Sequence, residues 1–241
     1  MADMRYALIP AYKPDRKLIN IAQELVRYGF NVVIVDDGSG KEYADIFCEV
    51  LPCADVVRHD VNRGKGAALK TGLKFIAESA GRGQTDGYVV VTLDADGQHS
   101  IPDAVRVTEA AEENRDALIL GTRGFDTQVP VKSRLGNDIT RGVFSFVTGV
   151  KIHDTQTGLR AFSDKQVEFM KTIEGDRYEY EINVLLEYAK SNIKISEVPI
   201  KTIYLEDNKS SHFHAVRDSF LIYMEILKHI NIRMERRGAG W

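Results

Sequence analysis

Two carboxylates one residue apart, Asp94 and Asp96, follow directly after an apolar run at residues 89–91. If the chain turns at Gly97, both carboxylates can reach one divalent cation, and Gln98 could add a neutral oxygen. Hard cations such as Mg²⁺ prefer these oxygen ligands and leave positions for phosphate and water. The alternative is a solvated acidic loop, because such triplets are common. Their position after an apolar run favours a metal site.

A second acidic pair, Asp36 and Asp37, ends the apolar run 30–35 in the same way. A carboxylate at this place could accept hydrogen bonds from a nucleotide base or ribose. The competing interpretation is a turn or a helix N-cap, for which Asp is equally suited. Both acidic pairs thus follow apolar runs, so we expect a ligand site at the ends of the predicted strands.

Lys65 lies between two glycines at the predicted start of a helix. The segment is not a Walker A loop, because it lacks the earlier glycine and the Ser or Thr after the lysine. It is not a dinucleotide fingerprint either, because Leu69 stands where the third glycine is required. A lysine flanked by glycines at a helix start can still approach a nucleotide closely. A plain turn before a helix explains the pattern equally well.

Basic side chains elsewhere could bind a diphosphate. Arg123, Arg134 and Arg160 adjoin small or polar residues in predicted loops. Arginine suits bidentate contact with phosphate, although each of the three could be an ordinary surface residue. His212 and His214 follow the polar stretch 206–211, which is predicted to be an exposed loop, with diphosphate contact as the minority interpretation.

The elements that must position these residues alternate along the first half of the chain. Strands are predicted at residues 6–9, 30–35, 56–57, 87–93 and 117–120, with helices between them at 15–29, 66–80 and 102–114. This order predicts an α/β fold with a doubly wound, mostly parallel sheet flanked by helices. Ligands bind such sheets beyond the carboxyl ends of the strands, where both acidic pairs lie.

The second half is less regular. Helices are predicted at 134–147, 178–189 and 215–232, and a strand at 193–199. The helices at 134–147 and 216–232 are amphipathic and could lie on a membrane surface, or else pack on the domain or a second subunit. No linker divides the chain, so we expect one domain at 1–210 and a C-terminal amphipathic helix with a basic tail at 211–241.

Bulk properties exclude several classes of protein. The 44% hydrophobic content is ample for a core, and the formal charge of -3 does not favour nucleic-acid binding. Cys48 and Cys53 lack partners at zinc-like spacing, so we expect two reduced thiols. There is no signal peptide pattern and no run of about 18 apolar residues. These features predict a cytoplasmic protein, or one peripheral at the inner face of the membrane.

Seven motifs in order resemble the inverting family 2 glycosyltransferases with the GT-A fold, and most closely the dolichyl- and polyprenyl-phosphate mannosyl- and glucosyltransferases. The similarity covers about residues 5–205. The matching segments are 9–12, 35–39, 62–69, 93–99, 121–123, 154–162 and 178–181. The family usually reads Asn-Glu after its first tyrosine, where this chain has Lys13-Pro14, so base recognition is expected to differ in detail.

The resemblance implies a role for each matching residue. Pro10, Tyr12, Asp36 and Asp37 would surround the base and ribose, and Asp94, Asp96 and Gln98 would hold Mg²⁺ or Mn²⁺ against the donor diphosphate, near Lys65. Arg123 and Arg134 would face the donor or acceptor phosphates. Glu179 falls where related soluble members carry their catalytic base, although a phosphate acceptor is already ionised and needs no strong base.

The expected reaction moves a hexose from a GDP- or UDP-sugar to polyprenyl phosphate with inversion, as a step in cell-envelope biosynthesis, by a chain that could form homo-oligomers. A soluble enzyme acting on a capsular or cell-surface glycan is the alternative. A sugar-phosphate nucleotidyltransferase would carry a Gly-rich Gly-Thr-Arg loop directly after its first strand. In this chain the Gly-Thr-Arg triplet lies in the middle of the sequence, at 121–123, and Pro10-Ala-Tyr12 follows the first strand instead. An inactive nucleotide-sugar-binding protein is the remaining alternative.

Overall fold

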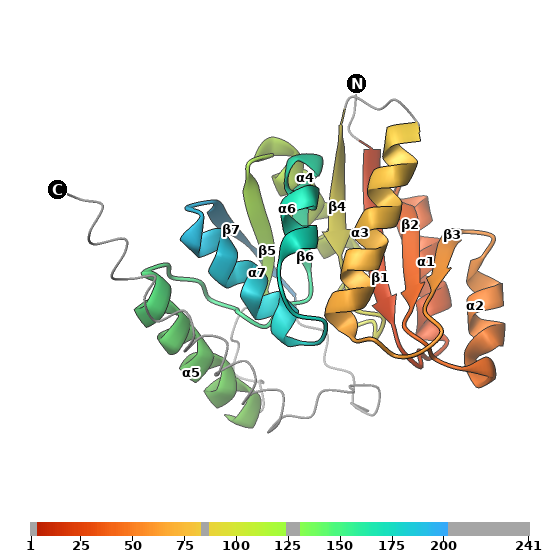
Figure 1. The fold of residues 1–241 in the computed structure, drawn as a ribbon, viewed down its shortest axis with the longest axis horizontal. Coiled ribbons are helices and arrows are strands. Elements are labelled where there is room, and N and C mark those ends of the chain that lie inside the picture. The colour runs from red at the N-terminus through yellow and green to blue at the C-terminus, as the bar shows by residue number, and fades with distance from the viewer. Residues whose placement is uncertain (1–3, 83–86, 124–130, 202–241) are drawn as a thin grey trace.

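The computed structural model describes residues 4–82, 87–123 and 131–201 (Figure 1). Within these ranges a single sheet of seven strands has the order β3-β2-β1-β4-β6-β5-β7. The strands are β1 (Met4–Ala11), β2 (Asn31–Asp36), β3 (Ala54–Arg58), β4 (Tyr88–Thr92), β5 (Ala117–Arg123), β6 (Arg160–Ser163) and β7 (Lys194–Ile200). The predicted α/β architecture with a mostly parallel sheet is confirmed.

The sheet is parallel except at β6, which pairs antiparallel with both β4 and β5. β1 lies between β2 and β4 and is parallel to both, and β5 is parallel to β7. Because β6 is antiparallel to its two neighbours, β4 and β5 point the same way. The carboxyl ends of β1, β2, β4 and β5 and the start of β6 therefore meet at one edge of the sheet.

Helices cover both faces of the sheet. They are α1 (Lys17–Arg27), α2 (Ala44–Val50), α3 (Lys65–Arg82), α4 (Ile101–Glu113), α5 (Val131–Thr148), α6 (Val167–Thr172) and α7 (Glu179–Lys190), with short 3₁₀ turns at Lys41–Tyr43 and Asp164–Gln166. Figure 1 shows α3, α6 and α7 in front of the sheet. Alternate β1 residues pack into two cores, Leu8 with α3 and α7, and Ile9 with α1, α2 and α4.

Most predicted elements are present, with shifted ends. β1 continues through Pro10 to Ala11, two residues beyond the predicted strand. The helix expected after Asp15 is α1, and the Asp15 carboxylate accepts a hydrogen bond from the Lys17 N–H at 2.7 Å. α4 begins as predicted, with Pro102 in its first turn and the Ser100 hydroxyl accepting from the Asp103 N–H. A side-chain cap is therefore present at the start of α4, whereas the N-cap of α1 is Arg16, which has no side-chain cap hydrogen bond.

The structure also contains elements that the sequence did not predict, and some predicted features lie outside the residues it describes. The short helices α2 and α6 and the antiparallel strand β6 were not predicted. His212, His214 and the C-terminal helix and tail at 211–241 lie outside the described residues. In the part that the structure describes, no helix is long and apolar enough to span a bilayer. Cys48 and Cys53 both have free thiols.

Candidate active site

The carboxylate of Asp94 is the centre of the site. It lies just beyond β4, where Lys65 Nζ is 2.7 Å from Oδ1 and His99 Nε2 is 3.6 Å from Oδ2. Gly158 lies against the same carboxylate, since a Cβ added there would be 2.3 Å from Asp94 Oδ2. Asp94 is therefore fixed by a lysine, a histidine and a glycine that arrive from three different segments of the chain.

Lys65 joins two carboxylates from opposite sides of the site. Its ammonium is 2.7 Å from Asp94 Oδ1 and 2.8 Å from Glu181 Oε2, and only 16% of its side chain is exposed. Burial opposes the charge on Lys65, but the two carboxylates outweigh it and raise the pKa of the ammonium. Burial likewise opposes ionisation of Asp94, but Lys65 and His99 together lower the pKa of its carboxyl. Both groups are charged at neutral pH.

Asp96 lies two residues after Asp94, in the same loop beyond β4. Gly97 has a positive φ of 79°, which supplies the predicted turn, and the Gln98 N–H donates to Asp96 Oδ1 at 2.9 Å. Burial and the neighbouring charge of Asp94 raise the pKa of the Asp96 carboxyl. The two carboxylates are thus close enough for the charge of Asp94 to oppose ionisation of Asp96.

The donor atoms fit a hard divalent cation only in part. Among the described residues, no group of three or more His, Cys, Asp or Glu side chains is arranged to hold a metal. Asp94 and Asp96 supply two carboxylates, and buried His99 has an Nδ1 atom with no hydrogen-bond partner in that part of the chain. Mg²⁺ and Mn²⁺ sites often have few protein ligands and take the rest from phosphate and water. The site therefore suits a cation shared with a diphosphate.

Asp37 organises the loop in front of Lys65. It is 3% exposed, and its carboxylate faces four donors from the protein. The donors are His59 Nδ1 at 2.7 Å, Asn62 Nδ2 at 2.9 Å, the Arg63 N–H at 2.9 Å and the Gly64 N–H at 2.8 Å. Since the last of these precedes Lys65 directly, Asp37 fixes the chain that presents the lysine.

Asp36, at the end of β2, lies beside the end of β1 at the same edge of the sheet. The Ser39 N–H donates to Asp36 Oδ1 at 2.9 Å, and the Ser39 hydroxyl accepts from the Lys13 N–H at 2.8 Å. The ammonium of Lys13 lies 5.4 Å from the centre of the Tyr12 ring. Pro10 pairs with Val35 in the sheet. The structure thus brings the residues predicted to surround the base and ribose together at one edge.

The predicted arginines have different surroundings. Arg123, at the end of β5, forms an ion pair with fully buried Asp154, with Nε 2.7 Å from Oδ2. Arg134 belongs to α5, but its side chain lies outside the described part of the structure. Arg160 is 3% exposed and donates to the carbonyls of Thr157 and Glu181. Arg160 therefore ties the start of β6 to α7 from inside the protein and is not at the surface.

Glu181, rather than Glu179, binds Lys65. The Glu179 carboxylate accepts the N–H groups of Asp176 and Arg177, both at 3.1 Å, and so fixes the segment that leads into α7. Glu181 lies half a turn further on and carries the ion pair with Lys65. Both acids belong to the matching segment 178–181. They differ in their partners, because Glu179 binds the backbone before α7 and Glu181 binds Lys65.

The glycines beside Lys65 have a packing role. A Cβ on Gly64, whose φ is 107°, would lie 2.4 Å from the Asp176 carbonyl oxygen. A Cβ on Gly66 would lie 2.5 Å from Tyr180 Cβ. The Ala67 N–H also donates to the Asp176 carbonyl at 2.9 Å. The two glycines thus allow the starts of α3 and α7 to approach, which brings Lys65 to Glu181.

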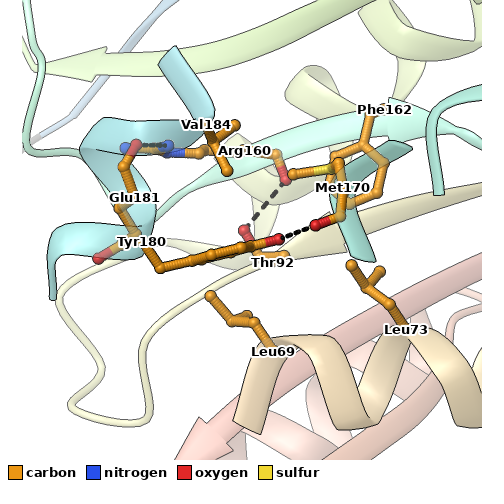
Figure 2. A pocket seen from close by; sticks show the side chains of 9 residues that line it. All are labelled: Leu69, Leu73, Thr92, Arg160, Phe162, Met170, Tyr180, Glu181 and Val184. Atoms are coloured by element: carbon orange, nitrogen blue, oxygen red, sulfur yellow. Dashed lines mark hydrogen bonds between the residues drawn. The ribbon is translucent and has the colours of Figure 1, made fainter. Parts of the chain in front are cut away.

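A small cavity lies beneath these residues (Figure 2). Most of its lining is apolar, from Leu69, Leu73, Phe162, Met170 and Val184. The hydroxyl of Tyr180 crosses it to donate to the Met170 carbonyl at 2.9 Å. Its lining does not include Asp94, Asp96 or Lys65, but it does include Glu181. The cavity therefore adjoins the site through the partner of Lys65.

The comparison with known proteins fits this arrangement of fold and site. Residues 7–169 match the sequence family described as Glycosyl transferase family 2, which is more than half of the chain. The chain therefore belongs to the family 2 glycosyltransferases and is a glycosyltransferase. The predicted enzyme class is confirmed, in preference to a nucleotidyltransferase.

Two curated relatives match most of this chain. The chain is 30% identical over 228 residues to the UDP-N-acetylglucosamine--dolichyl-phosphate N-acetylglucosaminyltransferase of Methanococcus voltae, covering 86% of this chain and 88% of that protein. It is 25% identical over 232 residues to the dolichyl-phosphate beta-glucosyltransferase of Dictyostelium discoideum, covering 86% and 68%. The predicted similarity to the polyprenyl-phosphate branch is confirmed.

A solved structure has the same fold. Glucosyl-3-phosphoglycerate synthase from Mycobacterium tuberculosis, crystallised with Mn²⁺, UDP and glucosyl-3-phosphoglycerate, superposes with a TM-score of 0.70. Sequence identity is 15%, and the match covers 95% of this chain and 81% of that one. This likeness confirms the predicted GT-A-type fold.

Proposed function

We propose that the protein transfers a hexose from a nucleoside-diphosphate sugar to a polyprenyl phosphate, with a divalent cation bound and with inversion at the anomeric carbon. The observation that carries the proposal is the arrangement of Asp94, Asp96 and Lys65 at the carboxyl edge of the sheet. Two carboxylates that interact, next to an ammonium, match the oxygen ligands of a cation and the negative charge of a diphosphate.

The donor would lie along this edge. Asp94, Asp96 and Gln98 would hold Mg²⁺ or Mn²⁺, which when bound would stabilise the charge that develops on the departing diphosphate. The nucleotide would be GDP or UDP, and its base and ribose would contact Pro10, Tyr12 and Asp36. We assign Asp37 to the support of the loop at 62–64, because its carboxylate already faces four donors.

The acceptor phosphate would approach from the face opposite the nucleotide. Its ionised oxygen attacks the anomeric carbon, so an α-linked donor gives a β-linked product. Arg123 and Arg134 would orient the phosphates, and the buried Asp154 carboxylate fixes the direction of the Arg123 side chain. No proton has to be removed from this acceptor, which agrees with the use of the Glu179 carboxylate at the start of α7.

The choice of a lipid phosphate is supported by the names of the two curated relatives, both of which act on dolichyl phosphate. Such an enzyme would work at the inner face of the membrane, as a peripheral protein. The amphipathic helix α5 and the segment 211–241 are the candidates for that contact or for contact with a second copy of the chain.

A transfer assay tests the proposal. Radiolabelled UDP-N-acetylglucosamine, UDP-glucose and GDP-mannose are each incubated with dolichyl phosphate and Mn²⁺, and labelled lipid is measured after extraction. We expect labelled lipid from one donor, its loss with EDTA, and a fall of at least about 100-fold in Asp96→Ala. Transfer to a saccharide, with no labelled lipid from any donor, would support the glycan-acting alternative instead. An α-linked product would contradict inversion.

A further inference from the structure

The ammonium of Lys65 contacts the Asp94 carboxylate on the oxygen Oδ1, where a metal ion could otherwise bind. It is bound to Asp94 Oδ1 at 2.7 Å, while His99 faces the other oxygen at 3.6 Å. A basic side chain therefore lies near each oxygen of Asp94. A cation that approaches Asp94 must either displace one of these groups or lie beside a positive charge.

Lys65 is held so that it cannot easily leave. Glu181 binds it at 2.8 Å, and the backbone on either side of it is fixed by the bond from the Gly64 N–H to Asp37 and by that from the Ala67 N–H to the Asp176 carbonyl. These three contacts thus keep the ammonium at Asp94. Its position belongs to the fold rather than to one flexible side chain.

The balance of charge gives this ammonium two opposite effects. Asp94, Asp96 and Glu181 supply three carboxylates, of which Lys65 compensates one. Lys65 repels a second cation at short range, so it weakens metal binding. A diphosphate is attracted by the metal and by Lys65 together. The metal ion and Lys65 repel each other when the diphosphate is absent. When the diphosphate is bound, both of them attract it.

We propose that Lys65 is an internal cation that keeps metal affinity low until the nucleotide diphosphate binds, and so makes metal and donor bind cooperatively. This inference rests on the proposed function, since it concerns the same metal and the same donor. It predicts effects of opposite sign when the charge is removed. Metal alone binds more tightly, whereas nucleotide in the presence of metal binds more weakly.

The test measures Mn²⁺ binding to the full chain from the electron paramagnetic resonance signal of free Mn²⁺, without nucleotide. We expect Lys65→Met to bind Mn²⁺ about tenfold more tightly than the wild type. Lys65→Gln keeps a hydrogen-bond donor for Asp94 and serves if the methionine variant does not fold, as judged by circular dichroism. UDP and GDP are then titrated at saturating Mn²⁺, where we expect weaker binding by the same variants.

Lys17→Met is the matched control. Lys17 lies beside the same turn, since a Cβ on Gly97 would be 3.5 Å from Lys17 Cδ, but its ammonium pairs with Asp15 at 3.3 Å. We expect less than about a twofold change in its Mn²⁺ affinity. An equal gain in this variant would mean that any nearby positive charge acts in the same way, and would overturn the proposal.

The outcomes separate this inference from the proposed function. Unchanged or weaker Mn²⁺ binding by the folded Lys65 variants overturns the inference, while a wild type that binds Mn²⁺ with UDP or GDP leaves the function standing. If the wild type binds no Mn²⁺ even with either nucleotide, the metal-dependent function itself is wrong.

Discussion

Gly158 sets the position of the Asp94 carboxylate at the scale of single residues. The contact is close enough that a methyl group in place of its hydrogen would lie 2.3 Å from Asp94 Oδ2 and 2.8 Å from Cγ. One of the two must move, and the oxygen belongs to the proposed metal site. The glycine of segment 154–162 is therefore a requirement of the site geometry as much as of the backbone.

Gly158→Ala is expected to lower transfer activity by at least about tenfold, because a displacement near 1 Å of a group in the site is costly. Mn²⁺ affinity in the presence of nucleotide should fall with it. Gly81→Ala, on α3 with no atom within 4 Å of the added methyl group, is the control and should keep wild-type activity. Full activity and metal affinity in Gly158→Ala would show that Asp94 does not need this position.

The two neighbouring acids Asp36 and Asp37 are predicted to respond differently to the loss of charge. Asp37→Asn places an NH₂ group among four donors, so the free energy of unfolding should fall by about 2–4 kcal/mol. Asp36→Asn keeps an oxygen for the Ser39 N–H and should cost about 1 kcal/mol or less. Urea unfolding of both variants measures the difference. Equal losses would contradict the assignment of Asp37 to loop support.

Single elements show where the sequence was sufficient and where it was not. Parallel strands such as β2 and β4 can be predicted from the sequence, because they are apolar runs followed by acidic residues. The start of α4 can be predicted from Ser100 and Pro102. β6 has four residues within a segment recognised only as a motif, and its antiparallel pairing depends on contacts far along the chain. Glu181 was missed because its role depends on where α7 begins and on Lys65, which lies more than a hundred residues earlier.

The start of α7 gives a prediction about its two acids. Glu179→Gln keeps an oxygen for the N–H groups of Asp176 and Arg177, so we expect kcat within about threefold of the wild type. Glu181→Gln removes one charge from Lys65 and should lower kcat/KM by about tenfold or more. Steady-state transfer assays on both variants decide it. A Glu179→Gln variant with almost no turnover would instead support a base at this position.

For the whole molecule, tyrosines whose pKa is raised by burial should limit stability at alkaline pH, and Tyr88 in the sheet is one of them. Tyr6 on β1 and Tyr88 on β4 meet edge to face, with ring centres 5.6 Å apart. Burial, together with the charges of Asp164 and Glu168, raises the pKa of Tyr88 to about 12 from an ordinary value of 10.0. Burial also raises the pKa of Tyr6. The folded protein therefore binds these protons more tightly than the unfolded chain does.

The sign of the effect follows from this difference. Below pH 10 both states keep the tyrosine protons, so stability is fully present, and it is lost as the pH rises towards the Tyr88 value of about 12. Urea unfolding at pH 9, 10 and 11 should show a falling free energy of unfolding, with a shallower fall in Tyr88→Phe. Absorbance at 295 nm should register late ionisation of one tyrosine in the wild type that is missing in the variant. Identical slopes for both proteins would mean that Tyr88 ionises as readily in the sheet as in the unfolded chain, and that the limit arises elsewhere.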